Sequence, residues 1–335
     1  MHTRITPFVV ASLIAIAACA PDNPTGTRLT VPAASESRTP SQSGWSLAQS
    51  AESGWPGADS TFNTVALDGC PFVAPDGRSF YMASTRPGGL GGIDIWVSTR
   101  SSAHEPWGPP HNVGAPVNSA SNDFCPTMSR DGHTLYFVSN RPGGCGLGDI
   151  YVARRRDDEG FEEPENLGCD VNSAADEASP FPLEEPGRGR VLYFSSTRPG
   201  GFSPEAEGVP TGDSDLYSSE WHGGSFGRPT LVAGVNTAAD DGQPNLRRDA
   251  LELFFYSTRP GGYGAADLYS ASRARASDAW STPVNLGAHV NSVAAETRPS
   301  LSWDGGTLYF GSTRTGGEGM SDIYVTQRSP IFGAP

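Results

Sequence analysis

The chain is short of basic residues. Among its 335 residues, 23 are Lys or Arg and 37 are Asp or Glu, so the formal net charge is −14 at pH 7. A protein with this charge is repelled by nucleic acids and by anionic lipid surfaces. The notable basic run, Arg154 to Arg156, is followed at once by the acids Asp157 to Glu159, which is typical of a solvated hairpin tip. We therefore expect no nucleic-acid partner.

The patterns of familiar enzymes and metal sites are missing too. The six histidines show no His-Glu-x-x-His spacing and the five cysteines form no Cys-x-x-Cys pair, which speaks against a zinc site. No catalytic motif is convincing. The sequence therefore predicts a protein that is not an enzyme and that holds no cofactor.

Glycine and proline, by contrast, are abundant, with 41 and 29 residues. A long helical protein does not tolerate this content. Hydrophobic and aromatic residues, at 36% and 10%, suffice for a folded core. The composition favours an all-β fold with many turns.

One repeat runs through most of the chain. Arg-Pro-Gly-Gly, once Arg-Thr-Gly-Gly, recurs at spacings of 55, 57, 61 and 55 residues, starting at Arg86, Arg141, Arg198, Arg259 and Arg314. A second marker, Asn followed by Ser or Thr, starts the copies near residues 63, 118, 172, 236 and 291. Each of these Asn residues stands five positions before an acid: Asp68, Asp123, Glu177, Asp241 and Glu296. Two markers in register predict five copies of one structural unit.

Each copy contains four short β-type segments. In the second copy these are Cys125 to Ser129, Thr134 to Ser139, Asp149 to Ala153 and Glu165 to Gly168, and an Asp-Gly hairpin turn joins the first two. Four antiparallel strands repeated radially make a propeller blade, whereas a solenoid would need polar caps at both ends. We predict a five-bladed β-propeller.

The fifth copy stops after its third strand, so another part of the chain must complete its blade. We expect an N-terminal strand near Trp55 to close the ring. The predicted organisation is a signal peptide with a lipid attachment site at residues 1–19, a flexible tether at 20–53, the propeller at 54–329 and a tail at 330–335.

The motifs carry a family resemblance. The segments 126–132, 135–139, 141–144 and 149–151 resemble the WD-like β-propeller repeat of the TolB type, and the likeness extends from about Asn63 to Arg328. Proteins with this repeat are common in the bacterial envelope. The resemblance implies a binding or scaffolding module near the outer membrane or the peptidoglycan.

The N-terminus indicates export. A positively charged start, an apolar run from Pro7 to Ile16 that is too short to span a membrane comfortably, and small residues before Cys19 form a signal peptide. Ile16 to Cys19 resembles the bacterial lipobox, which implies acylation of Cys19; the alternative is ordinary cleavage near Ala18 or Ala20. We expect an exported protein, attached to the membrane through lipid alone, in the outer membrane and facing the periplasm or the cell surface.

Two sets of charged residues are candidate site residues. The acids that start the first strands, Asp68, Asp123, Glu177, Asp241 and Glu296, are expected to ring one mouth of the central channel as a binding face. Their recurrence in every blade favours instead a structural network in which the repeat arginines pair with them and with the acids of the third strands, because a catalytic site breaks the symmetry of a repeat. The network residues are Arg86, Arg141, Arg198, Arg259, Arg314, Asp94, Asp149, Asp215, Asp267 and Asp322.

Cysteines and one long loop break the symmetry. An exported protein meets an oxidising compartment, and we favour disulfides Cys145–Cys169 and Cys70–Cys125 among three possible pairings. The loop from Phe202 to Ser214 contains Glu205, Glu207 and Asp213 beside Asp215. These oxygen ligands make Ca²⁺ a candidate, the alternative being a solvated insertion.

These observations favour a non-catalytic binding or scaffolding protein that presents one loop face to an envelope protein or a glycan. Two alternatives stay open. One is a glycoside hydrolase that uses carboxylates at the channel mouth, since hydrolysis needs a pair of acids about 5–9.5 Å apart. The other is a glycan-binding lectin.

Overall fold

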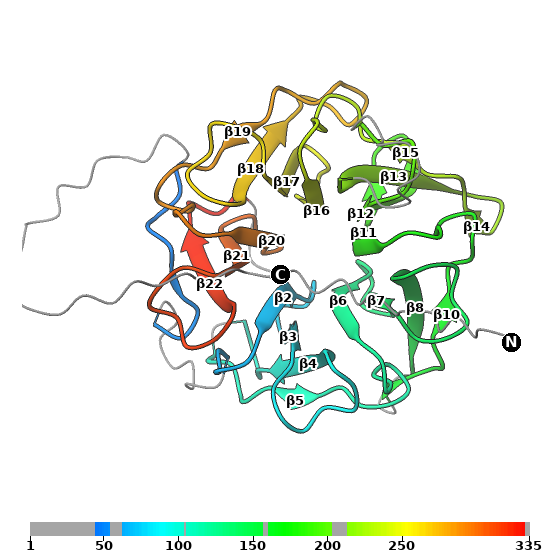
Figure 1. Cartoon of the computed structure of the whole chain (residues 1–335), viewed down its shortest axis with the longest axis horizontal. Coiled ribbons are helices and arrows are strands. Elements are labelled where there is room, and N and C mark those ends of the chain that lie inside the picture. The colour runs from blue at the N-terminus through cyan, green and yellow to red at the C-terminus, as the bar shows by residue number, and fades with distance from the viewer. Residues whose placement is uncertain (1–43, 54–61, 104, 157–159, 203–212, 332–335) are drawn as a thin grey trace, which may run out of the picture. The chain divides into compact units, whose positions relative to one another are not determined.

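A computed structural model describes residues 44–53, 62–103, 105–156, 160–202 and 213–331. The described residues form β-strands and no helix. The strands make five small antiparallel sheets around one centre (Figure 1). The fold is a five-bladed β-propeller, which confirms the prediction. The described part of the chain contains no helix of the length and apolarity that a membrane crossing requires.

In blades 1 to 4 the strands run in chain order from the centre to the rim. Blade 1 consists of β2 (Asp68–Val73), β3 (Ser79–Ser84), β4 (Asp94–Thr99) and β5 (His111–Asn112). Blade 2 consists of β6 (Asp123–Met128), β7 (Thr134–Ser139), β8 (Asp149–Arg156) and β10 (Glu165–Asn166), with β9 (Gly160–Phe161) on the end of β8.

Blades 3 and 4 follow the same plan. Blade 3 consists of β11 (Glu177–Glu185), β12 (Gly189–Ser196) and β13 (Asp215–His222), which pairs with both β14 (Ser225–Phe226) and β15 (Thr230–Leu231). Blade 4 consists of β16 (Asp241–Leu246), β17 (Glu252–Ser257), β18 (Asp267–Ser272) and β19 (Val284–Asn285).

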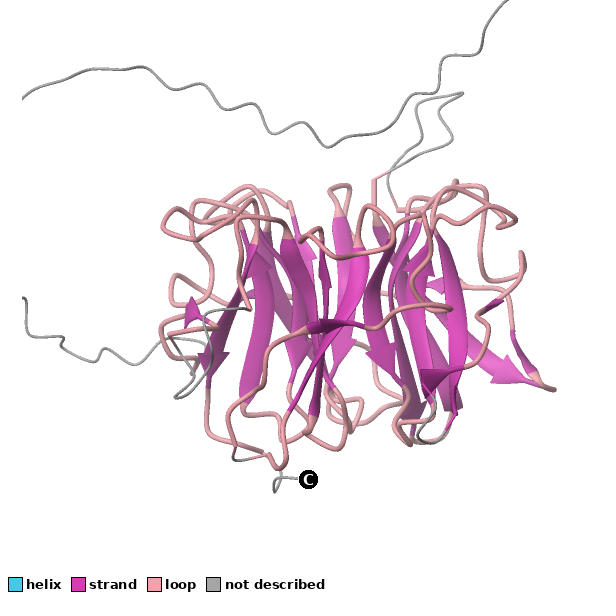
Figure 2. Cartoon of the chain, turned by 90° about the horizontal axis from the view of Figure 1, so that it is seen from below, coloured by secondary structure: helices cyan, strands magenta, loops and turns pink. Residues whose placement is uncertain are grey.

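Blade 5 joins both ends of the propeller. It consists of β20 (Glu296–Leu301), β21 (Thr307–Ser312), β22 (Asp322–Gln327) and, from the other end of the chain, β1 (Gln49–Ser50). Seen from the side, the strands end in loops on two opposite faces (Figure 2). The hairpin turns between the first and second strands lie on one face, which we call the hairpin face.

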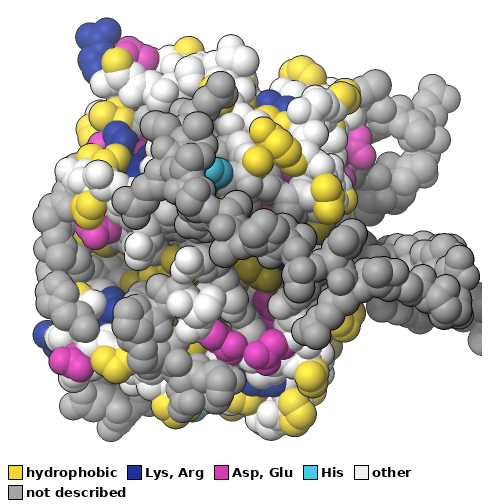
Figure 3. Space-filling view, turned by 90° about the vertical axis from the view of Figure 1, so that its left-hand side faces the viewer, with side chains coloured by type: hydrophobic (Ala, Val, Ile, Leu, Met, Phe, Trp, Pro, Cys, Tyr) yellow, Lys and Arg dark blue, Asp and Glu magenta, His cyan; other side chains and the backbone are white. Residues whose placement is uncertain are grey.

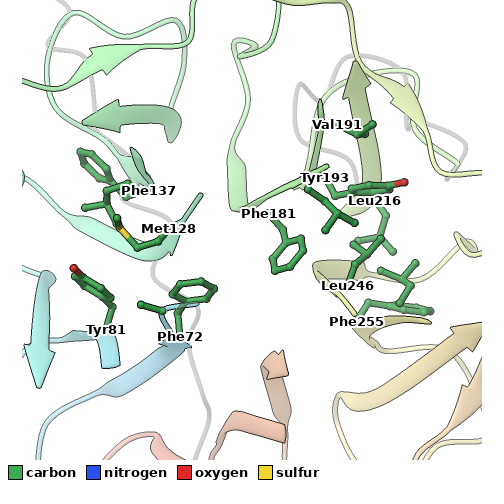
Figure 4. Close-up of a cluster of buried hydrophobic side chains, with 14 of the residues drawn as sticks. Phe72, Tyr81, Met128, Phe137, Phe181, Val191, Tyr193, Leu216, Leu246 and Phe255 are labelled. Carbon is green, nitrogen blue, oxygen red and sulfur yellow. The ribbon is translucent and has the colours of Figure 1, made fainter. Parts of the chain in front are cut away.

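The second strand of each blade is apolar on both sides because it is covered by a neighbouring blade on each side. In β7, Leu135, Phe137 and Val138 are 0% exposed. Figure 4 shows this packing between blades, where Phe72 and Met128 come from neighbouring first strands and point toward one another. Burial of these side chains removes apolar surface from water and holds the blades together.

A repeated asparagine also latches neighbouring blades. Asn118 accepts the Ile95 N–H at 2.8 Å through Oδ1 and donates to the Ile95 carbonyl at 2.8 Å through Nδ2. The side-chain amide of Asn118 therefore pairs with the backbone of β4 as a residue of a neighbouring strand would. The same two bonds join Asn63 to Ile323, Asn172 to Ile150, Asn236 to Leu216 and Asn291 to Leu268. The ring is closed by this latch as well, because Asn63 binds blade 5.

The closing strand lies nearer the N-terminus than the sequence predicts. Gln49 pairs with Val325 and Ser50 with Tyr324, so the strand falls in the segment that we expect to be a tether, while Trp55 lies outside the described residues. Trp45 stands four residues before this strand.

Two other blades carry a tryptophan at the same place, Trp107 before β5 and Trp280 before β19. In all three blades an arginine at the end of the third strand covers the ring, at 4.5 Å for Arg328 over Trp45 and 4.0 Å in the other two. The spacing from Trp to the outer strand is the sequence signal that locates the closing strand.

The first strand of each blade bulges where it reaches the centre. The register shifts between Gly69 and Phe72 in blade 1 and at the matching place in the other blades. Each bulge contains one residue with positive φ, between 47° and 58°: Cys70, Cys125, Ser179, Gln243 and Arg298. Together the five bulges surround one small cavity at the centre of the ring.

Candidate functional site

The acids predicted to ring the channel mouth are buried inside their blades. Asp68 is 0% exposed. Its Oδ1 accepts bonds from Arg86 at 2.6 Å and Ser84 at 2.5 Å, and its Oδ2 accepts bonds from the backbone and hydroxyl of Thr64, both at 2.7 Å. Both carboxylate oxygens are therefore satisfied from within the protein.

The other four blades repeat this arrangement. Arginine and carboxylate lie 2.6–3.1 Å apart in each blade, and the acids are at most 1% exposed. Each arginine also donates to the carbonyl before the latch asparagine and stacks on an aromatic ring of the third strand. The geometry assigns Asp68, Asp123, Glu177, Asp241 and Glu296 to a structural network.

The third-strand acids bind the backbone of the long loops instead of pairing with the repeat arginines. The Asp149 carboxylate accepts the backbone N–H groups of Cys145 and Gly146 and the side-chain amide of Asn166. Gly144 is packed so tightly against this carboxylate that a Cβ there would collide with it. Asp94, Asp267 and Asp322 bind their loops in the same way.

Asp215 departs from this pattern. Among the described residues, its side chain accepts one hydrogen bond, from the Phe202 N–H at 2.7 Å. Leu231 pairs with β13 where the outer strands of the other blades have a polar residue. Its Oδ1 is buried without a hydrogen bond. Burial, and then the nearby carboxylates of Asp241 and Asp213, raise the pKa of Asp215 to about 6.

We expect Asp215→Asn to change the pH dependence of stability. Because the folded pKa lies above the unfolded value near 3.8, the wild-type protein loses stability as pH rises from 4 to 7. Relative to Asp215→Asn, this loss amounts to about 1–3 kcal/mol. Urea unfolding of both proteins across this range measures it. Asp267→Asn is the control, since its carboxylate accepts three hydrogen bonds and the variant should be destabilised throughout; parallel curves for wild type and Asp215→Asn would refute the prediction.

The four cysteines beyond Cys19 form two disulfides. Cys70 and Cys125 are bonded between the bulges of blades 1 and 2, with Cα atoms 4.8 Å apart, and Cys145 is bonded to Cys169 with Cα atoms 5.6 Å apart. These are the pairings that we favour from the sequence. The first one connects two blades directly at the centre.

The candidate Ca²⁺ loop is described only at its ends. Glu205 and Glu207 lie outside the described residues. In the part that is described, no three His, Cys, Asp or Glu side chains gather as a metal site would need. Calcium binding by this loop therefore stays a prediction.

Larger hollows lie on the hairpin face, opposite to the face predicted for binding. One cavity of about 660 Å³ lies between blades 1 and 2 and is lined by Asp76, Asp131, His133 and Trp303 among others. A second, of about 340 Å³, lies between blades 2 and 3 and is lined by Asp131 and Glu184. On the side of the molecule seen in Figure 3, charged side chains appear in small groups rather than as one patch.

Asp131 lies where the two larger cavities meet. Ser129 Oγ donates to its Oδ1 at 2.5 Å, and the backbone N–H of His133 donates at 3.0 Å. These hydrogen bonds, the Ser129 bond first, lower the pKa of Asp131 and keep it ionised. Glu184 on the far wall of the smaller cavity pairs with Arg190 at 3.3 Å.

Trp303 is a functional candidate that sequence reasoning missed. It occupies the second position of its hairpin turn, where blades 1, 2 and 4 have Pro75, Arg130 and Arg248. The guanidinium groups of Arg130 and Arg248 each lie 5.9 Å from its ring centroid. The signal was available, because an aromatic residue stands at this turn position in one blade alone.

The comparisons with known proteins concern the fold. No protein-family model matches the chain, and no curated protein matches it. Among solved structures, a xylan β-1,4-xylosidase from Bacillus halodurans C-125 is similar, with a TM-score of 0.54 and 12% identity over 80% of this chain and 54% of that one. A GH43_12 protein from the capybara gut metagenome has a TM-score of 0.51 and 11% identity over 84% and 57%. A putative TolB from Agrobacterium tumefaciens has a TM-score of 0.46 and 14% identity over 80% and 85%.

The similar structures correct one prediction. The xylosidase is an enzyme that shares the propeller fold, so this fold carries catalysis elsewhere, and the expectation from the sequence that the protein is not an enzyme is corrected. The expectation rested on the lack of a local motif. A propeller brings side chains together from separate blades, so a catalytic pair in this fold leaves no contiguous motif in the sequence.

Proposed function

We propose that the protein is a glycoside hydrolase that acts on a polysaccharide at the hairpin face. The observation that carries the proposal is the position of Asp131. It lines both of the larger cavities, and each cavity has a second carboxylate, Asp76 in one and Glu184 in the other.

Glycoside hydrolysis uses two carboxyl groups with different tasks. One protonates the leaving oxygen as the glycosidic bond breaks, and the other attacks the sugar carbon or removes a proton from the attacking water. Asp131 suits the second task because its hydrogen bonds keep it ionised. Glu184 and Asp76 are the candidates for the proton donor.

Trp303 and Arg130 supply binding groups beside these acids. An aromatic ring that is partly exposed in a cavity packs against the apolar face of a sugar ring. Arg130 lines both cavities, where its planar guanidinium can bond adjacent hydroxyl groups or a sugar carboxylate.

The fold supports this proposal in a limited way. The xylosidase and the GH43_12 protein share the propeller, but the chain spans little more than half of each, so their activities are not transferred whole. The proposal also keeps the protein exported and lipid-anchored through Cys19, with a glycan as its partner.

Asp131→Asn tests the proposed reaction. We expect release of reducing sugar from a panel of xylans, arabinans and uronate-containing polysaccharides by the full chain, and a 10²–10⁴-fold lower rate for the variant. Asp304→Asn is the matched control. Asp304 takes the same place in the hairpin turn of blade 5, with Ser302 at 2.5 Å, and does not line either cavity. Equal rates for Asp131→Asn and wild type, or no hydrolysis of any substrate, would overturn the proposal.

A further inference from the structure

An arginine recurs at the end of the third strand in four of the five blades, six residues after the acid that starts this strand. Two of these arginines bind a carboxylate of the preceding blade. Arg273 Nη2 lies 2.6 Å from Glu185 of blade 3. Arg328 binds both carboxylate oxygens of Glu252 of blade 4, at 2.6 and 2.8 Å. Each of these two blade junctions therefore contains an ion pair near the hairpin face.

Arg155 has the same position in blade 2 but lacks such a partner. Its backbone N–H donates to the carbonyl of His133 in the hairpin turn of its own blade, as the other three arginines do in theirs. Among the described residues its guanidinium makes neither a hydrogen bond nor an ion pair. Arg100, in blade 1, donates from its Nε to the Gly77 carbonyl at 2.7 Å. Of the four, Arg155 is thus the one whose guanidinium can take up a ligand without giving up a partner.

The hairpin turn of blade 1 explains the missing ion pair. Asp76 stands eight residues after the first acid of its blade, as Glu185 does in blade 3, but its side chain is shorter by one methylene group. Its Oδ1 accepts the backbone N–H of Arg78 at 2.8 Å, within the same turn. In the part of the chain that the structure describes, no ion pair joins Asp76 to Arg155. The junction between blades 1 and 2 instead contains the cavity of about 660 Å³.

This cavity is lined by groups suited to an acidic sugar. Arg155, Arg130 and His133 all line it, and the Arg130 guanidinium lies 5.9 Å from the ring centroid of Trp303, which lines it too. A guanidinium presents parallel N–H groups that match the two oxygens of a carboxylate. An indole packs against the apolar face of a sugar ring. The cavity therefore combines cationic and aromatic contacts beside Asp131, the carboxylate of the proposed reaction.

We propose that the substrate of this hydrolase is a uronate-containing polysaccharide, and that Arg155 binds the carboxylate of a uronic acid unit in the cavity between blades 1 and 2. This inference rests on the proposed function, because it names the substrate class of the same site. The sugar carboxylate takes the place beside Arg155 that Glu185 takes beside Arg273. The net charge of −14 opposes a polyanion at long range, but physiological salt screens charges beyond about 8 Å, so the contacts inside the cavity decide binding.

Hydrolysis rates on paired polymers test the substrate class. Glucuronoxylan and polygalacturonate are each supplied to the full chain in native form and with the carboxyl groups reduced to alcohols, at physiological salt. We expect kcat/KM to be about 10-fold lower on the reduced form of the polymer that is hydrolysed. Arg155→Met should lose the same factor on the native form and nothing on the reduced form.

Arg154→Met is the matched control for this experiment. It removes the same charge from the neighbouring residue, which lines neither of the larger cavities, and its rates should equal those of the wild type. Equal rates on native and reduced polymers, an Arg155→Met variant that matches the wild type, or hydrolysis of neutral polysaccharides alone would refute the inference and leave the proposed hydrolysis standing.

A binding measurement keeps the two failures apart. Asp131→Asn is titrated calorimetrically with acidic oligosaccharides prepared from the same two polymers and with their reduced counterparts. We expect about 10-fold weaker binding of the reduced forms, and the same loss for the acidic forms when Arg155→Met is added. If no polymer is hydrolysed but this pattern of binding is found, the proposed reaction fails and the carboxylate site stands. Absence of binding, or equal affinity for acidic and reduced oligosaccharides, would disprove the site itself.

Discussion

Asp123→Ala is expected to lower the free energy of unfolding by about 3–5 kcal/mol. The variant leaves Arg141 without its carboxylate at 2.7 Å, and the hydroxyl and backbone N–H of Ser119 lose their acceptor. The pair is buried, with Asp123 at 0% exposure, so water cannot replace the lost partner. A cation that stays buried and unpaired accounts for most of the loss.

Urea unfolding followed by tryptophan fluorescence measures this effect. Asp278→Ala serves as the control, because Asp278 pairs with the exposed Arg275 at 3.3 Å and such pairs contribute about 1 kcal/mol or less. Adding Arg141→Met to Asp123→Ala should recover part of the stability, since the stranded charge is then removed. A loss below about 1 kcal/mol in Asp123→Ala would show that the buried network does not hold the blade.

Trp45→Ala is expected to cost about 3–5 kcal/mol and to loosen the ring closure. Trp45 is 2% exposed, packs edge-on against Phe254 at 6.0 Å and lies under Arg328. It precedes β1, whose two residues pair with β22 and whose neighbours Ser46 and Ala51 donate their N–H groups to the carbonyls of Gln327 and Ile323. Packing of the tryptophan holds this strand against β22.

Two measurements separate this effect from a general loss of stability. Urea unfolding gives its size, and limited proteolysis reports whether residues 44–53 become accessible before the rest of the propeller. Trp303→Ala is the matched control, since the same side chain is removed from a partly exposed turn and the stability should change by about 0.5 kcal/mol or less. Wild-type stability and protection in Trp45→Ala would contradict the role of this residue in closure.

Much of the fold was predictable because the same sequence motifs recur in all five blades. The Asn marker and the Arg marker recur in each blade since each performs one task there, Asn118 as a latch to the preceding blade and Arg141 as the partner of Asp123. A role that is repeated in every blade leaves a periodic trace in the sequence. The number of blades and the second strand Thr134–Ser139 follow from this trace alone.

The closing strand and the candidate site were predicted less well for the same reason. Gln49 and Ser50 carry no repeat marker, and only the spacing from Trp45 reveals them. The five acids that recur in all blades were candidates for a binding ring or for a structural network, and their recurrence favours the network. Asp131 and Trp303 resemble ordinary turn residues in the sequence, and their importance depends on which cavities they line.

The sequence by itself determined the repeat, the strand order within a blade and the pairing partners inside each copy, because these depend on contacts between residues near one another in the chain. The tertiary structure alone decided which carboxylates are buried and which face of the propeller carries the larger cavities. These properties arise where separate blades meet, and the distance between two side chains from different blades has no counterpart in their separation along the chain.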